Sequence, residues 1–113
     1  YAKEGMAQES KKAREYKSLA KGAPALIINS GLMPTLAFYN HKGGSAKRLL
    51  DHLIRGLFER LAGKRIESNQ GAALFVSLME TLHSCSSQEY VRYTDEALEI
   101  LKWVRQFVDA VEG

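Results

Sequence analysis

Histidine, cysteine and acidic side chains are the residues of this sequence whose chemistry suits catalysis or metal binding, and few of them are close together. His83 and Cys85 lie two residues apart near the predicted end of a helix. A structural zinc site needs four ligands, and neither a second cysteine nor a closely spaced histidine accompanies this pair. The pair is therefore a weak zinc signal, and we expect no metal or other cofactor.

Asp51 and His52 are a second candidate, because some metal phosphohydrolases use an adjacent histidine and aspartate. Here the order is reversed, and no further histidine and aspartate flank the pair at a useful spacing. Asp51 precedes Arg55 by four residues, a spacing that predicts an ion pair on one helix face. We therefore predict a solvated helix face at this point. Since no nucleophile is paired with a base elsewhere either, we do not expect an enzyme.

The stretch His41-Lys42-Gly43-Gly44 combines two possible cations with backbone amides that flexible glycines leave accessible. Such a combination can hold one phosphate group. It lacks the spaced glycines and the terminal Lys-Ser or Lys-Thr of a nucleotide-binding loop. The stretch is thus a candidate phosphate contact and not a nucleotide-binding motif.

Charge is divided unevenly along the chain. Residues 1–65 hold thirteen Lys and Arg against five acids, a net charge of +8, whereas residues 66–113 hold three against eight, a net charge of −5. This division suggests a surface for a polyanion on one side and an acidic surface, solvated or facing a partner, on the other. The alternative is that the charges only solvate helix faces.

Length and composition limit the fold class. A chain of 113 residues with 45% hydrophobic residues buries one core but is too short for two ordinary domains. We therefore expect residues 1–113 to form a single helical domain. No apolar run approaches the roughly 20 residues of a membrane helix, no signal-peptide pattern follows Tyr1, and the lone Cys85 excludes an intramolecular disulfide framework. These features predict a cytoplasmic protein without membrane contact.

Periodicity predicts an all-α fold, a compact bundle of about five to six helices. An amphipathic helix from Ala2 to about Lys21 places one apolar arc opposite a basic face that holds Lys3, Lys11, Arg14, Lys17 and Lys21. Its apolar arc consists of Ala2, Met6, Ala13, Tyr16 and Ala20. Pro24 then starts a short helix, Ala25–Ser30, which Gly31 ends in a left-handed conformation. The run Ala25–Ile28 also suits a buried strand, but no second strand-like run is present to pair with it.

Four further helices follow from the same reasoning. Pro34 starts a short helix that stops at Gly43 and Gly44, and Ser45 is the predicted N-cap of a helix from about Ala46 to Ala62 that Gly63 ends. After a polar turn over residues 64–71, apolar residues from Leu74 to Leu82 predict the next helix. The last helix begins with the capping box Ser86-Ser87-Gln88-Glu89 and keeps its apolar stripe for about six turns. That stripe consists of Tyr90, Ala97, Leu101, Val104, Val108 and Val111.

The aromatic residues lie on or beside these apolar stripes. Phe38, Phe75, Trp103 and Phe107 are therefore predicted to pack in the core rather than to stack on bases. Tyr93, beside Arg92, is a candidate for a protein interface or for stacking on a base.

Two composite motifs in the chain resemble the small helical subunit of the type III-B CRISPR Cmr complex, an RNA-targeting complex. The first lies between residues 16 and 42 and consists of Tyr16, Leu19, Ala20, Pro24, Ile27, Ile28, Asn29, Gly31, Leu32, Thr35, Leu36, Ala37, Phe38 and Lys42. The second lies near the C-terminus and consists of Thr94, Glu96, Ala97, Leu98, Trp103, Arg105 and Phe107. Together they span about half of the chain in the order that the family shows.

The resemblance implies a helical subunit without an active site, which lines the groove for guide and target RNA in a crRNA-guided effector complex and helps its assembly in antiviral defence. Its partners would be the backbone subunit, further copies of itself and the crRNA with its target; no small-molecule substrate is implied. The chain departs from the family pattern at Met33 and Pro34, where Gly-Gln is usual, and at Asp95 and Gln106, where basic residues are common. The two lost cations direct the expected RNA contact to the N-terminal half.

We therefore predict that RNA phosphates meet a basic surface formed by six residues: Arg14, Lys17, Lys21, Lys42, Lys47 and Arg48. Lys42 matches a family position, and the others belong to the basic face of the first helix or to the start of the fourth predicted helix, from about Ala46 to Ala62. The alternative function is a purely structural helical spacer that contacts protein alone.

Overall fold

Helix α3 (Gly44–Leu57) is the element against which the other helices pack, and it owes this place to a dense apolar stripe. Its leucines and Ile54 recur at spacings of three and four residues, which places them on one side of a helix. All five are buried: Leu49, Leu50, Leu53, Ile54 and Leu57. The helix continues into a short π-helical turn, η1 (Phe58–Ala62). The predicted helix over 46–62 is therefore confirmed, with a change of winding near its end.

The computed structural model describes the backbone of residues 2–62 and 71–112, and the side chains of residues 11–61 and 71–110. All its elements are helical, in the order α1 (Ala2–Ser30), α2 (Leu32–Lys42), α3, η1, α4 (Gly71–Ser84) and α5 (Ser87–Glu112). The predicted all-α bundle is confirmed. The end of a helix at Gly63, the polar turn from residue 64 to residue 70 and the side chains of Ala2, Met6 and Val111 lie outside the described residues.

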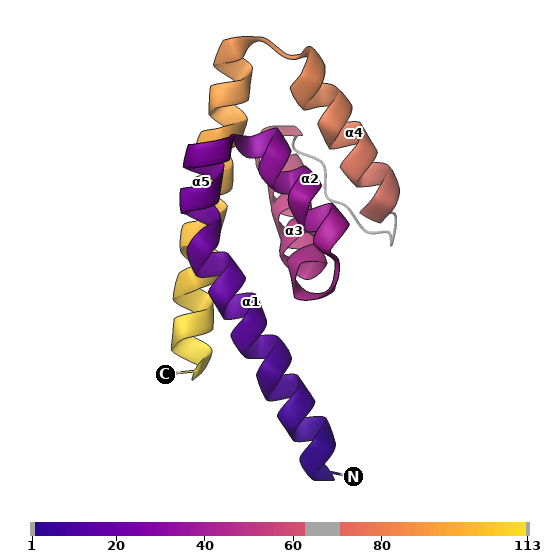
Figure 1. Cartoon of the computed structure of the whole chain (residues 1–113). Helices are drawn as coiled ribbons and strands as arrows, with labels where there is room; N and C mark the ends of the chain where they lie inside the picture. The colour runs from indigo at the N-terminus through magenta and orange to yellow at the C-terminus, as the bar shows by residue number, and fades with distance from the viewer. Residues whose placement is uncertain (1, 63–70, 113) are drawn as a thin grey trace.

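Helices α1 and α5 lie side by side and run in opposite directions, and α2, α3 and α4 lie to one side of this pair (Figure 1). The N-terminal part of α1 projects beyond the other helices, which gives the molecule its long axis of 50 Å against 28 and 25 Å (Figure 1). Among the side chains of α1 that the structure describes, from residue 11 on, those of Ala20, Ala23 and Ile27 are buried, in the C-terminal part of the helix. Ala13, predicted on the apolar arc, is exposed.

Pro24 lies inside α1 and does not begin a new helix, so the predicted boundary between Lys21 and Ala25 is wrong. Proline lacks the N–H that bonds the carbonyl four residues earlier, and in a helix interior it costs about 3 kcal/mol. Ala20, Ala23 and Ile27 are buried on one face across this point, and their packing offsets that cost. The alternative of a strand over 25–28 is excluded, because these residues are helical.

Two glycine-containing turns join α1, α2 and α3. Gly31 ends α1 as predicted, with a positive φ of 97°, but its ψ of 159° lies outside the left-handed helical region. Helix α2 begins at Leu32, so Pro34 occupies its first turn rather than its first position. Gly43 and Gly44 follow with φ of 71° and 58°, which explains why glycine occupies both positions where the chain turns.

Ser45 is not the N-cap of α3, contrary to the prediction, because α3 begins one residue earlier, at Gly44. Gly43 is the N-cap and has no side chain to bond the first turn. The Ser45 hydroxyl instead donates to Oε2 of Glu15 on α1, at 3.3 Å. By contrast, the capping box of α5 is supported, since the Glu89 amide donates to the Ser86 hydroxyl at 3.1 Å.

Candidate nucleic-acid interface

The six predicted cations fall into two groups, and the first of them lies on α1. Arg14, Lys17 and Lys21 are three and four residues apart, so their side chains leave the helix on the same side. Arg14 and Lys21 are exposed and Lys17 is half-buried. Lys17 Nζ is 3.4 Å and Lys21 Nζ is 3.7 Å from Oδ1 of Asp109 on α5. Within this α1 group, Lys17 and Lys21 are therefore directed toward α5.

The second group surrounds the turn between α2 and α3. Lys42 is the last residue of α2, Lys47 and Arg48 lie in the first turns of α3, and all three are exposed. Lys42 Nζ lies 5.7 Å from the centre of the Phe38 ring, and Arg48 Cζ lies 5.9 Å from the centre of the Tyr16 ring. These distances fit cation–π contacts, which hold the charged groups at the surface without neutralising them.

Lys47 and Arg48 also border a hollow of about 440 Å³ between α2, α3 and the start of α4. Asp51 and His52 line it together with apolar residues. The full lining is Asn40, Gly44, Lys47, Arg48, Leu50, Asp51, His52, Ile54, Gly71, Ala72 and Phe75. Lys47 and Arg48 of the α2–α3 group thus border a recess that one imidazole and one carboxylate also line.

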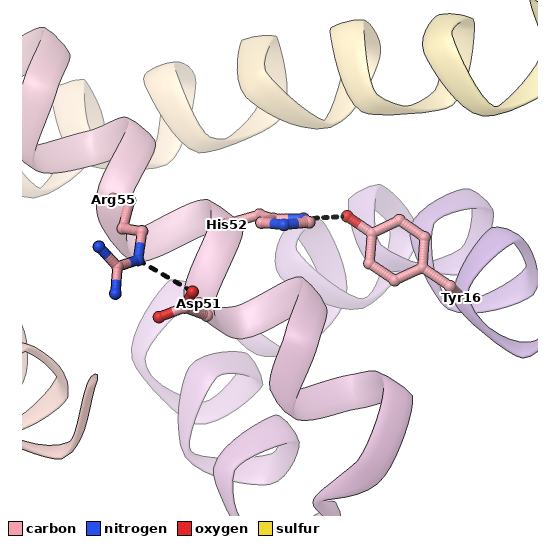
Figure 2. A network of polar contacts seen from close by, with 4 residues as sticks. All are labelled: Tyr16, Asp51, His52 and Arg55. Carbon is pink, nitrogen blue, oxygen red and sulfur yellow. Dashed lines mark hydrogen bonds and ion pairs between the residues drawn. The ribbon is translucent and has the colours of Figure 1, made fainter. Parts of the chain in front are cut away.

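A small polar network connects α1 with α3 beside this group (Figure 2). Tyr16 Oη and His52 Nδ1 are 2.5 Å apart, and the hydroxyl donates when the imidazole is neutral with its proton on Nε2. Partial burial is the main cause that lowers the pKa of His52 below its ordinary value of 6.5. Burial likewise raises the pKa of Tyr16 above 10. Both effects favour the neutral hydrogen-bonded pair at neutral pH.

Asp51 and Arg55 behave as the sequence predicts. Arg55 Nε is 2.9 Å from Asp51 Oδ2, an ion pair between residues four apart on one helix (Figure 2). The Asp51 carboxylate also opposes the lowering of the His52 pKa, whereas the charges of Arg48 and Arg55 add to it. His52 is therefore engaged by Tyr16 on α1 and lies near the charges of Asp51, Arg48 and Arg55, an arrangement that serves helix contact.

The stretch 41–44 is only partly available for a phosphate. His41, Lys42 and Gly44 are exposed, but the Gly43 amide donates to the Tyr39 carbonyl at 3.1 Å. The backbone of Gly43 therefore contributes no free donor, and Lys42 is the group of this stretch best placed to meet an anion.

His83 and Cys85 lie at the end of α4, as predicted. The Cys85 thiol is half-buried and directed to the Leu82 carbonyl at 3.4 Å. Over the described residues, no three histidine, cysteine or acidic side chains are grouped closely enough to hold a metal ion.

The aromatic residues of α5 depart from the prediction. Trp103 and Phe107 were predicted in the core, yet they are 57% and 70% exposed. They lie one helical turn apart and therefore form one exposed aromatic face at the C-terminal part of α5. Phe38 is also exposed, while Phe75 and Tyr93 are half-buried against the core. Apolar periodicity places these residues beside the stripe but does not show how far the neighbouring helices extend over them.

Three features of the surface carry no sequence signal strong enough to reveal them: the Tyr16–His52 contact, the pairing of Lys17 and Lys21 with Asp109, and the aromatic face of Trp103 and Phe107. The first two join residues that are distant in the chain. The sequence hints at these two contacts only in that each partner lies on the edge of an apolar stripe, where neighbouring helices meet.

These observations define the class of the protein: an all-helical protein with a basic N-terminal half, exposed cations on α1, α2 and α3 of that half, and an exposed aromatic face. None of the described helices has both the length and the hydropathy needed to cross a membrane. The sequence matches the family of CRISPR-associated proteins designated Cas_Cmr5 over residues 2–111. The chain belongs to this family and is a Cmr-type subunit of a CRISPR effector complex. No match was found among curated proteins or among solved structures.

Proposed function

We propose that the chain is a non-catalytic subunit that lines the groove for guide and target RNA in its effector complex, and that the six cations contact RNA phosphates. One observation carries this proposal: five of the six are exposed, in the half of the chain with a net charge of +8. A phosphate backbone is the polyanion that such a surface attracts without regard to base sequence. That suits a guided complex, because base pairing with the guide supplies the specificity.

The α2–α3 group provides the sharper test, because Lys47 and Arg48 lie on one helix and are both exposed. The variant Lys47→Gln/Arg48→Gln should weaken the binding of target RNA by the reconstituted complex for all target sequences alike. The salt dependence of the binding constant should fall by about one unit of slope for each lost phosphate contact.

The matched control is Lys102→Gln/Arg105→Gln, which removes two exposed cations from α5 in the acidic half of the chain. It should leave affinity and slope near their wild-type values. If the α3 double variant binds RNA with unchanged affinity and slope, the α2–α3 group does not contact phosphate and this part of the proposal fails.

The absence of catalysis is a separate part of the proposal. The described residues contain no group of metal ligands, and Asp51 and His52 are engaged with Arg55 and Tyr16. The isolated chain should not cleave single-stranded RNA with or without Mg²⁺ or Mn²⁺. Cleavage that disappears in a His52→Gln variant would refute it.

A purely structural spacer is the second candidate, and the exposed aromatic face favours it. Exposed aromatic side chains are frequent anchors of protein interfaces. Under this function, Trp103→Ala/Phe107→Ala would abolish co-purification with the backbone subunit or with further copies of the chain. The cation variants would then leave RNA affinity unchanged in the complexes that still form.

A further inference from the structure

The carboxylate of Asp109 on α5 lies beside Lys17 and Lys21, at a position that an external anion bound by these two lysines would otherwise take. Its Oδ1 lies within 3.4 Å of Lys17 Nζ and 3.7 Å of Lys21 Nζ, so a single carboxylate oxygen is shared by two ammonium groups one helical turn apart. A phosphodiester likewise presents anionic oxygens with one negative charge. The two lysines are therefore held in a geometry that fits a phosphate as well as a carboxylate.

The ion pairs of Asp109 with Lys17 and Lys21 are weak enough for a phosphate to replace the carboxylate. The side chains of Lys21 and Asp109 are 49% and 55% exposed, and that of Lys17 is 27% exposed. Ion pairs at such positions are screened by water and salt and contribute little net stability. An arriving polyanion therefore competes with Asp109 for the two lysines against weak, exposed ion pairs.

Asp109 is also poorly explained as a stabilising residue. It lies in the last turn of α5, where the partial negative charge of the helix end opposes a carboxylate. The contact between α1 and α5 does not depend on it, since Ala20 and Ala23 on α1 and Ala97 and Leu101 on α5 are fully buried in one core.

We propose that Asp109 is an internal substitute for an RNA phosphate: it orients Lys17 and Lys21 in the free protein and is displaced when RNA binds. This inference rests on the proposed function, because it requires these two lysines to contact RNA. As a consequence, Asp109 lowers the affinity of the α1 group for RNA. Only polyanions that contact the protein at several points at once then bind to it.

The test is Asp109→Asn in the reconstituted effector complex, with a labelled single-stranded RNA complementary to the guide as the probe. Asparagine keeps the shape of the side chain and removes its charge. The variant should bind the RNA about two- to fivefold more tightly, the range that follows from the typical strength of a surface ion pair. Wild-type affinity or weaker binding would overturn the inference.

Glu99→Gln is the matched control, because it removes one exposed carboxylate from the same helix, ten residues or roughly 15 Å nearer its start. That distance exceeds the Debye length of about 8 Å at physiological salt. The control should change the affinity less than twofold. A gain equal to that of Asp109→Asn would show a general effect of net charge and would overturn the inference.

A second background separates this inference from the proposed function. Lys17→Gln/Lys21→Gln should weaken RNA binding, and adding Asp109→Asn to it should have no further effect. If the lysine variant binds RNA as the wild type does, the α1 group does not contact RNA, and the proposed function fails for that group. If the lysine variant weakens binding but Asp109→Asn does not tighten it, only the role of Asp109 fails.

Discussion

The same substitution at two helical glycines should have opposite effects on stability, because only one of the two lies against another helix. Gly22 is on an exposed part of α1, and a Cβ added there meets nothing within 4 Å. Gly56 is on α3, where an added Cβ would lie 2.8 Å from Cδ1 and 3.3 Å from Cγ1 of Ile100 on α5. Ile100 is itself buried, so its side chain has little room to move.

The magnitudes follow from two opposing effects. Replacing glycine with alanine inside a helix stabilises it by about 1 kcal/mol. Gly22→Ala should gain most of this. At Gly56 the same gain is opposed by overpacking against Ile100, which costs about 1–3 kcal/mol. Gly56→Ala should therefore destabilise the protein by about 1 kcal/mol, and the two variants should differ by about 2 kcal/mol.

Urea unfolding of the isolated chain, followed by circular dichroism, measures both variants on one scale. The corresponding difference in melting temperature is about 8 °C, at about 4 °C per kcal/mol for a chain of this size. Ile100→Val removes the Cδ1 atom that lies nearest the new methyl group. In that background Gly56→Ala should no longer destabilise. If Gly56→Ala stabilises the wild-type chain as much as Gly22→Ala does, α3 and α5 are not packed as closely as described.

Two further predictions concern contacts between helices. The Tyr90 hydroxyl accepts a hydrogen bond from the Met33 amide at 3.0 Å and so satisfies a backbone donor in the first turn of α2. Tyr90→Phe should therefore lower the free energy of unfolding in urea by about 1–2 kcal/mol. The Tyr93 hydroxyl bonds to no described residue, so the control Tyr93→Phe should lower it less. The lowered pKa of His52 means that the unfolded chain takes up a proton at higher pH than the folded one. Stability should therefore be retained above pH 6.5 and fall as the pH drops below it toward the folded-state pKa, and His52→Gln should flatten this dependence. A wild-type unfolding free energy that rises between pH 7 and pH 5.5 would contradict the direction of the shift.

The helices themselves could be predicted because local patterns specify them. The stripe of α3 from Leu49 to Leu57 and the capping box at Ser86 are complete within one helix or one turn, so no distant residue is needed to recognise them. The errors lie where packing outweighs a local preference. Pro24 is a helix breaker by its chemistry, but the burial of Ala20, Ala23 and Ile27 holds α1 together around it.

For the candidate site, the sequence indicates which residue types gather in which half of the chain, but it does not give their arrangement in space. The sequence by itself determined that the chain is helical, that its cations gather in residues 1–65, and that motifs around Tyr16 and Trp103 resemble those of the Cmr small subunit. Tertiary structure decided that Lys17 and Lys21 meet Asp109, that Arg48 lies over Tyr16, and that Trp103 and Phe107 are exposed. The reason is physical: helix periodicity fixes which residues share a face, whereas the length and crossing of neighbouring helices fix what that face meets.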